Sequence, residues 1–358
     1  MKRILFITPF TPCNKDAGSN YTKQLLEKLS LSNQIDLCYF KYKNDPLYNP
    51  SNKNIQIIKK FSNNKLLKIT NIIFFPFLFP LFTVRFNWII LIQLYYLTRK
   101  RNYDIIYCDF SQTFLYAKFL RHNNIILMSH DVIYQRFSRK KINFKTWIKY
   151  SENWVLHGKN KHTFTFSPKD NQLLSTLYDI KSKDVCFFIP QSIYNTTPST
   201  LTNNIIFFGM WKRADNYQSL EWFIDNILPH ITCNTTIIGG GLPNHLNDKI
   251  KKLKNIQYIG FIENPYPIIA NAKALLSPLF SGAGVKVKVI EALACGTPVI
   301  GSKIAFEGID NIYHNFMIEV NTIPEYITAI ENIHFSLEER IEFKKFFQQN
   351  YSKKSILD

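Results

Sequence analysis

The sequence has no paired cysteine motif. Its six cysteines form no C-x-x-C pair and no histidine cluster accompanies them; they are Cys13, Cys38, Cys108, Cys186, Cys233 and Cys295. This spacing excludes the usual zinc and iron–sulfur sites, and scattered thiols are typical of a chain kept in a reducing cytosol. We therefore expect a cytoplasmic protein without a bound metal.

The chain also lacks an uninterrupted hydrophobic run of membrane-spanning length. The longest candidate, residues 72–97, is broken by Pro76 and Pro80, whereas a spanning helix needs about 20 mostly apolar residues. Besides a true transmembrane helix, the sequence allows two short helices over 72–83 and 87–98. These would pack on the domain or lie on a bilayer surface.

Acidic residues are scarce, but only in the first half of the chain. The 358 residues include 44 Lys and Arg against 26 Asp and Glu, which gives a net charge of +18. Residues 1–195 hold 29 basic and 11 acidic side chains, whereas residues 196–358 are balanced. With 46% hydrophobic residues, the composition excludes a disordered chain. The uneven charge predicts two domains with different partners.

Short apolar runs alternate with helical stretches throughout both halves. We expect strands over 4–8, 35–39, 104–108, 125–129, 163–166, 185–189, 205–208, 235–238, 256–259, 274–277 and 298–300. Buried strands that alternate with helices predict parallel, doubly wound α/β sheets. A polar stretch over 195–204 reads as a linker, so we predict domains over 1–195 and 196–334. A capping box at Ser336-Leu-Glu-Glu339 begins a terminal helix within 335–358.

The most informative segment is Ser277-Pro-Leu-Phe-Ser-Gly-Ala-Gly-Val-Lys-Val-Lys-Val-Ile-Glu-Ala-Leu-Ala-Cys-Gly-Thr-Pro-Val-Ile300. It reads as a strand, a glycine loop, a helix and a second strand. Gly282 and Gly284 allow a ligand to approach the backbone, and the amides of Gly284 and Val285 form an anion site. Lys286 and Lys288 lie in the first helical turn, where cations oppose the helix dipole, and an anionic group such as a diphosphate would reverse that penalty. Glu291 can accept two hydrogen bonds from a vicinal diol, as in a ribose. A helix with solvated lysines and one surface glutamate is the alternative.

This string resembles the donor-binding motif of GT-B glycosyltransferases, particularly family 4. In that family two glutamates bracket the loop; the second matches Glu291, whereas the first falls on Ala283. The resemblance implies that Glu291 binds the nucleotide ribose. It also implies a GT-B fold, in which two Rossmann-like doubly wound parallel-sheet domains face a cleft. The terminal helix over 335–358 would cross back onto the N-terminal domain.

Other strand-end loops resemble the same family. The segment from Ile205 to Asn216 is similar to its phosphate loop, with Lys212 and Arg213 near the phosphate-binding cation; two solvated loop cations are the alternative. The strand over 255–262 resembles the one that contacts the base through its backbone. The donor-side residues implied in addition to the loop are Gly18, Gly209, Lys212, Arg213, Gly260 and Phe261.

His130 follows a predicted strand, where the resemblance places a histidine against the reacting sugar and the acceptor. We therefore assign it the catalytic position, as a group that orients the donor sugar or stabilises charge and not as an obligatory base. Asp131 and Arg136 are candidates for the acceptor side. For Arg136 and Glu152 an internal ion pair is the other interpretation.

The resemblance implies transfer of a sugar from a nucleotide-diphosphate sugar to a glycan or lipid-linked acceptor, in polysaccharide or lipopolysaccharide synthesis. It also implies that the transfer retains the anomeric configuration and that the enzyme needs no cofactor. The absence of any Asp-x-Asp motif fits metal-independent transfer. A nucleotide-sugar epimerase of the same fold and a polyanion or nucleic-acid binder are the rival functions. The basic segment Arg139–Lys149 interleaves cations with Phe144 and Trp147. It suits an interfacial helix on an anionic membrane, and a solvated helix with one buried stripe is the alternative. We expect a peripheral membrane protein and no nucleic-acid partner.

Overall fold

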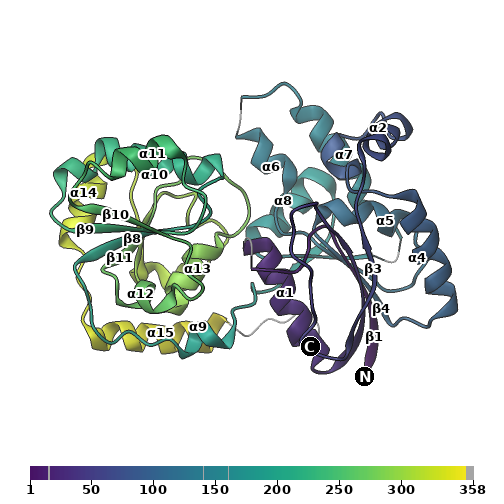
Figure 1. Cartoon of the computed structure of the whole chain (residues 1–358), viewed down its shortest axis with the longest axis horizontal. Helices are drawn as coiled ribbons and strands as arrows, with labels where there is room; N and C mark the ends of the chain where they lie inside the picture. Colours follow the sequence, from purple (N-terminus) through teal and green to yellow (C-terminus); the bar gives the residue numbers. More distant parts are fainter. Residues whose placement is uncertain (15–16, 140, 160, 352–358) are drawn as a thin grey trace. The chain divides into compact units, whose positions relative to one another are not determined.

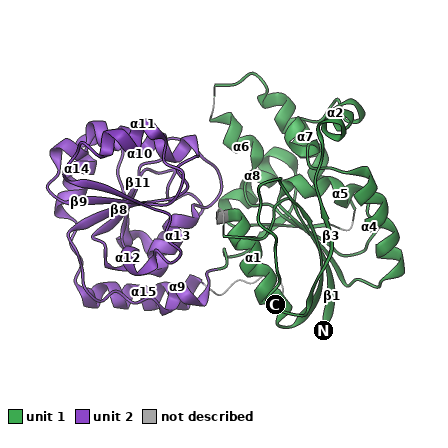
Figure 2. Ribbon diagram, viewed as in Figure 1, with its two compact units in different colours: residues 1–188 green, residues 189–358 purple. Residues whose placement is uncertain are grey.

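The computed structural model describes residues 1–14, 17–139, 141–159 and 161–351. The chain divides into two compact units, residues 1–188 and residues 189–358 (Figure 2). Each unit is built on one parallel β-sheet that has helices on both faces (Figure 1). The predicted doubly wound α/β class is confirmed in both units.

The N-terminal unit has a seven-stranded parallel sheet in the order β3-β2-β1-β4-β5-β6-β7. Its strands are β1 (Lys2–Thr8), β2 (Asn33–Phe40), β3 (Ile55–Phe61), β4 (Ile105–Asp109), β5 (Ile125–Met128), β6 (Lys161–Thr165) and β7 (Ser182–Asp184). Strand β1 lies in the interior of the sheet. Its run Ile4–Ile7 is entirely buried, as expected for a strand that helices cover on both faces. The chain order reverses beside β1, so the neighbouring strand ends form the crevice where α/β sheets bind ligands.

The helices of this unit are α1 (Ala17–Ser30), α2 (Lys65–Phe74), α3 (Pro80–Thr83), α4 (Trp88–Lys100), α5 (Phe114–Phe119), α6 (Ile133–Ser138), α7 (Lys145–Leu156) and α8 (Pro168–Tyr178), with a 3₁₀ turn at Ser111–Thr113. The apolar stretch over 72–97 holds the end of α2, all of α3 and most of α4. The helix expected over 72–83 is therefore divided in two, and Pro80 takes the first position of α3. Among the described residues, no helix is both long and apolar enough to cross a membrane.

The C-terminal unit has a six-stranded parallel sheet in the order β10-β9-β8-β11-β12-β13. Its strands are β8 (Asn204–Phe208), β9 (Asn234–Ile238), β10 (Ile256–Gly260), β11 (Ala274–Ser277), β12 (Val299–Gly301) and β13 (Met317–Glu319). Its helices are α9 (Gln191–Asn195), α10 (Ala214–Asn226), α11 (Asn244–Ile250), α12 (Tyr266–Asn271), α13 (Val287–Ala294), α14 (Ile323–Asn332) and α15 (Leu337–Tyr351), with 3₁₀ turns at Leu228–His230 and Asn311–Phe316.

Two strands were not predicted, and one predicted strand lies at a different place in the chain. Strands β3 and β13 were not predicted, because both lie at sheet edges and are only partly buried, which blurs the apolar signal. The strand predicted over 185–189 is replaced by β7, which ends just before it at Asp184. Beyond that end, the amide of Val185 donates one backbone hydrogen bond to the carbonyl of Thr165.

The terminal helix α15 begins with the predicted capping box. The Glu339 amide donates to Ser336 Oγ (3.2 Å), and the Ser336 amide donates to Glu339 Oε2 (2.7 Å). The buried Arg340 of this helix donates to the carbonyl of Gly296 (2.8 Å) and so fastens α15 beside α13 in the C-terminal unit. Packing of the helix onto the N-terminal domain stays a prediction, and residues 352–358 lie outside the described residues.

Candidate functional site

The loops that follow β8 and β9 touch each other without intervening side chains. Gly239 has a φ of +119°, and a Cβ there would lie 1.8 Å from the carbonyl oxygen of Gly209. The indole of Trp211 donates to the carbonyl of Ile238 (3.1 Å) and holds the first loop down on the second. The glycines at these strand ends therefore allow two loops to share one edge of the sheet.

The loop between β11 and α13 carries the predicted glycines in unusual backbone conformations. Gly282 has a φ of +135° and Gly284 a φ of +65°. Lys286 occupies the N-cap of α13, where no side chain caps the helix, and its ammonium group donates to the carbonyl of Gly284 (2.6 Å). The glycines thus fold the loop back on the lysine, and the amides of the first turn of α13 carry the positive end of the helix dipole.

The loops after β8 and β11 are joined by polar contacts that sequence reasoning missed. Ser281 donates its hydroxyl proton to Asp215, and Arg213 lies 4.0 Å from the other oxygen of that carboxylate. Asn216 donates to the carbonyl of Met210 (2.8 Å). These contacts tie the start of α10 to the glycine loop.

Three cations converge where these loops meet. Lys288, the second lysine of the first helical turn, has a half-buried side chain whose ammonium end is enclosed. Burial, together with the positive charges of Arg213 and Lys286, lowers the pKa of Lys288 to about 7. Its Nζ lies 3.4 Å from Asn216 Oδ1. In the described part of the chain, no carboxylate forms an ion pair with Lys288. A cluster of like charges without such a partner is destabilising, and an anionic ligand relieves it.

Glu291 lies on α13, and its side chain is buried with only 8% of the residue exposed. Tyr266 donates its phenol proton to Glu291 Oε1 (3.0 Å). Burial raises the pKa of the Glu291 carboxyl to about 7, against the lowering effect of the tyrosine hydrogen bond. The second carboxylate oxygen is left to accept further hydrogen bonds. Tyr266 gave no sequence signal, because its partner lies 25 residues further along the chain.

The remaining donor-side residues lie on the neighbouring loops. Gly260 ends β10 with a φ of +77°, its carbonyl accepts from the amide of Gly239 (2.7 Å), and Phe261 is two-thirds exposed. Lys212 is exposed, and its stem packs where a side chain on Gly241 would lie. The structure thus gathers most of the predicted donor residues on one edge of one sheet.

His130 of the N-terminal unit has a buried carboxylate as its partner. Its Nε2 lies 2.7 Å from Asp109 Oδ1, and Asp109 is completely buried at the end of β4. Thr22 donates to the other oxygen, Oδ2, at 2.7 Å, and the hydroxyl of Thr8 points to the same oxygen at 3.4 Å. Sequence reasoning missed Asp109, although β4 and β5 pair side by side and their ends meet.

Aromatic rings surround the His130 imidazole. Phe110 stacks on it with ring centroids 3.5 Å apart and an interplanar angle of 13°, while Tyr21 and Phe166 approach it edge-on. Phe110 has a φ of +61°, which is rare for a bulky residue. Such backbone strain is concentrated at functional sites.

The other residues predicted near His130 have structural partners. Asp131 and Arg136 form an ion pair at 3.5 Å. Glu152 does not pair with Arg136, because its two carboxylate oxygens accept the amides of Ile133 and Tyr134 at the start of α6 (2.7 and 2.8 Å). Gly18 lies in the first turn of α1, where its carbonyl accepts a hydrogen bond from Thr22. It belongs to the N-terminal unit, whereas the other proposed donor residues belong to the C-terminal unit.

In the basic segment over 139–149, the tryptophan makes contacts within the N-terminal unit. Trp147 donates to the carbonyl of Phe77 (2.7 Å) and packs edge-on against Phe79, while Phe144 is more than half exposed. Lys140 lies outside the described residues.

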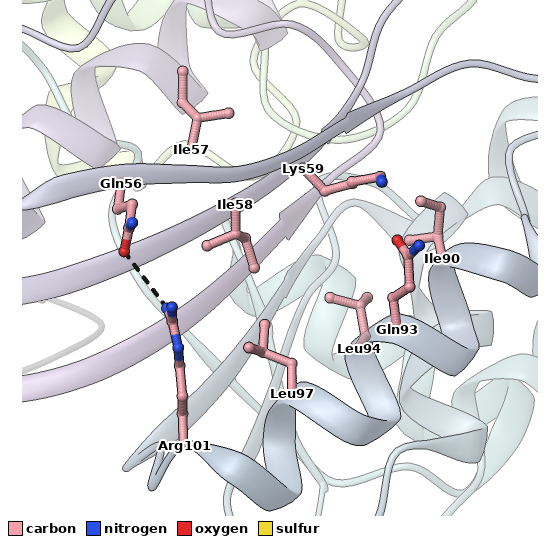
Figure 3. A pocket seen from close by; sticks show the side chains of 9 residues that line it. All are labelled: Gln56, Ile57, Ile58, Lys59, Ile90, Gln93, Leu94, Leu97 and Arg101. Carbon is pink, nitrogen blue, oxygen red and sulfur yellow. Dashed lines mark hydrogen bonds between the residues drawn. The ribbon is translucent and has the colours of Figure 1, made fainter.

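A hollow of about 380 Å³ lies between β3 and α4 in the N-terminal unit (Figure 3). Ile58, Leu94 and Leu97 form its apolar side, and Arg101 reaches across it toward Gln56. Its residues come from the middle of an edge strand and from one helix, and none of them was predicted as a site residue.

Comparisons with known proteins place the C-terminal unit in a family. Residues 202–334 match the family model described as "Glycosyl transferases group 1". A protein from Klebsiella pneumoniae, described as an uncharacterized 44.6 kDa protein in the cps region, is 24% identical over 169 residues. That alignment spans 43% of this chain and 44% of the relative, less than half of each.

Solved structures of similar fold cover nearly the whole chain. Sucrose-phosphate synthase from Thermosynechococcus elongatus is 16% identical with a TM-score of 0.71, over 98% of this chain and 95% of its own. HepE from Anabaena, in complex with UDP, is 13% identical with a TM-score of 0.67 over 98% and 96%. WaaG, a glycosyltransferase involved in lipopolysaccharide biosynthesis, is 11% identical with a TM-score of 0.65 over 99% and 96%.

The two parallel sheets have the GT-B-like fold of these solved structures, and the cations and the buried glutamate lie at the strand ends of the second sheet. The domain over residues 202–334 matches the group 1 glycosyltransferases, which are family 4-like.

Proposed function

We propose that the protein transfers a sugar from a nucleotide-diphosphate sugar to a glycan or lipid-linked acceptor. The observation that carries this proposal is the cation cluster of Arg213, Lys286 and Lys288, on the same helix and loops as the buried Glu291. A diphosphate leaving group gains negative charge as the glycosidic bond breaks, and preorganised cations stabilise that charge.

Each donor contact follows from the chemistry of the residue. Lys286, Lys288 and the amides at the start of α13 bind the diphosphate, with Arg213 at its exposed side. Glu291 accepts hydrogen bonds from the ribose hydroxyls, and its bond from Tyr266 fixes the carboxylate in position. The protein cations supply the charge that a metal ion supplies elsewhere, so we propose metal-independent transfer.

The acceptor proposal rests on the relatives. The cps-region relative supports a surface polysaccharide pathway, and the solved HepE complex supports UDP as the first nucleotide to test. These likenesses favour a transferase over the two rivals, an epimerase of the same fold and a polyanion binder.

We also propose that the N-terminal unit docks on the cytoplasmic face of an anionic membrane. Helix α2 exposes Ile73 and Phe74, and α4 exposes Ile89 and Ile92, each by more than half. The unit carries the whole positive excess of the chain, so apolar insertion and attraction to anionic lipids would act together.

Isothermal titration calorimetry against UDP, GDP and their sugar derivatives tests the donor proposal. We expect one nucleotide to bind, and binding to persist in a chelator. Product analysis with candidate lipid acceptors then separates the functions, since a sugar isomer formed without acceptor indicates the epimerase. If no nucleotide binds while random DNA does, the transferase proposal is wrong.

Co-sedimentation with vesicles tests the membrane proposal. We expect the protein to bind anionic vesicles, to bind neutral ones weakly, and to dissociate as salt is raised. The double variant Ile89→Glu/Ile92→Glu on α4 should bind less. A matched control is Ile312→Glu, which is half exposed on the C-terminal unit. Equal partitioning of all proteins to neutral vesicles would contradict the electrostatic part.

A further inference from the structure

Four aromatic side chains follow the carboxyl ends of four neighbouring strands in the N-terminal unit. The strands β2, β1, β4 and β5 lie side by side, and the side chains that follow them are Tyr42, Phe10, Phe110 and His130. Phe110 stacks on His130 with ring centroids 3.5 Å apart, and Phe10 packs edge-on against Phe110 at 5.0 Å. Phe10, Phe110 and His130 therefore form a continuous row along the edge where α/β sheets bind ligands.

Arg85 continues this row, although sequence reasoning did not assign it to a site. It lies in the turn between α3 and α4. Its guanidinium carbon is 5.0 Å from the centre of the Phe10 ring and 5.6 Å from that of Tyr42. Its Nε donates to the hydroxyl of Tyr42 at 2.8 Å. Rings that cover a cation exclude water from that side, so its remaining hydrogen bonds become stronger.

Buried side chains fix the backbone of the turn that carries Arg85. Each of the four carbonyl groups of residues 83–86 accepts a hydrogen bond from a buried side chain. The donors are Asn63, Asn71 and Tyr116, at distances of 2.6 to 3.3 Å. These five hydrogen bonds hold a turn that is not helical in one conformation. Arg85 is therefore presented with little backbone freedom, and a ligand pays little entropy to order it.

The guanidinium of Arg85 keeps donors for a ligand. It carries five N–H groups in a planar fork, and in the described part of the chain only the one on Nε has an acceptor. No carboxylate of a described residue forms an ion pair with Arg85. The acidic residue in the loop after β2 is Asp45, whose Oδ2 accepts from the amide of Tyr42 and the hydroxyl of Thr11 (3.0 and 3.2 Å). The two terminal nitrogens of Arg85 therefore have the geometry that binds a phosphate or a carboxylate with two parallel hydrogen bonds.

We propose that Arg85 is the anion-binding residue of the acceptor site, and that the acceptor is a sugar that carries a phosphate or carboxylate group. This inference rests on the proposed transferase function, because it names the class of acceptor. The anionic group accepts two hydrogen bonds from the terminal nitrogens of Arg85. The rest of the acceptor follows Phe10 and Phe110 toward His130, where the resemblance places it. Every residue of this site belongs to the N-terminal unit.

Titration with three sugars tests the class of acceptor. Glucose 6-phosphate, glucuronate and glucose share one ring and differ in their anionic group. Isothermal titration calorimetry is carried out at low salt with saturating UDP, which occupies the proposed donor cations. We expect at least one of the two anionic sugars to bind about 10-fold or more tightly than glucose, and the tighter of the two identifies the anion. Equal affinity for all three sugars, or no binding of either anionic sugar, would overturn the proposal.

The substitution Arg85→Gln tests the residue. It should lower the affinity for the preferred anionic sugar by about 10-fold or more and leave the affinities for glucose and UDP unchanged. The matched control is Arg99→Gln, because Arg99 on α4 also lies over a tyrosine ring, that of Tyr95 (4.6 Å), and donates to its hydroxyl. Unchanged binding in Arg85→Gln, or an equal loss in Arg99→Gln, would show that Arg85 is not the anion-binding residue.

The substitution Arg85→Lys tests the two-bond geometry and keeps the positive charge. A lysine ammonium is a point charge without the fork, so we expect an affinity between those of the unaltered protein and Arg85→Gln. Affinity equal to that of the unaltered protein would contradict the paired hydrogen bonds. Titration with UDP alone separates the two proposals. If UDP does not bind the unaltered protein, the proposed function fails, whereas normal UDP binding without a preference for anionic sugars refutes only the role of Arg85.

Discussion

Replacing Glu291 by glutamine should weaken nucleotide binding while it stabilises the unliganded protein. Glutamine keeps the shape and the oxygen that accepts from Tyr266, but it loses the charge. A hydrogen bond to a charged group contributes about 1.5–3 kcal/mol, so we expect binding of the UDP-sugar to weaken by roughly 10- to 150-fold.

The stability effect follows from the pKa of Glu291. Burial raises that pKa from 4.5 to about 7 in the folded protein. The folded state therefore holds a proton that the unfolded chain has released, and this contribution is full below pH 4.5 and lost as the pH rises through 7. At about 1.4 kcal/mol per pKa unit, the loss is about 3 kcal/mol.

Glutamine does not titrate, so the stability of Glu291→Gln relative to the unaltered protein should rise between pH 4.5 and 7.5. Thermal unfolding across this range measures it, and about 2–4 °C per kcal/mol is expected for a unit of this size. Glu338→Gln, an exposed change on α15, is the matched control. A difference in melting temperature that is flat with pH would refute the burial argument, and unchanged UDP-sugar affinity would refute the ribose assignment.

Two further variants test other parts of the donor site. Lys288→Met should lose about 10-fold or more in affinity for UDP but not for uridine, since it removes a charge-assisted hydrogen bond to phosphate; equal losses for both ligands would argue against a phosphate contact. The low pKa of Lys288, about 7, means that the unaltered protein gains stability as pH rises above 7, so calorimetry should show the methionine variant relatively more stable at pH 6 than at pH 9. Gly239→Ala should unfold at a lower temperature and bind no nucleotide, because its Cβ would overlap the carbonyl of Gly209; a normal melting temperature would contradict the close approach of the two loops.

Much of the proposed donor site was predictable because it is local in sequence. A glycine loop, a cation and a glutamate on one short helix are set by spacing, so the structure has Lys286 at the N-cap and Glu291 on the helix, as the sequence indicates. The buried strands were equally predictable, since runs such as Ile4–Ile7 are continuously apolar. Edge strands such as β3 were missed because half of their surface faces solvent.

Contacts between distant segments could not be read from spacing. Tyr266 reaches Glu291 across 25 residues, and Lys288 reaches Asn216 across 72. The contact between Asp109 and His130 did have a usable signal, since Asp109 directly follows a predicted strand and parallel strand ends gather at one edge. That rule, applied to adjacent strands, places Asp109 beside His130.

The sequence by itself determined the fold class, the excess of positive charge in the first half and the donor loop, because each depends on local pattern and composition. Only the tertiary structure decided the electrostatic state of the site residues. The carboxyl of Glu291, the ammonium of Lys288 and the partner of His130 depend on burial and on groups brought together from separate strand ends. A charge has its ordinary properties in water, and it is the surrounding protein that changes them.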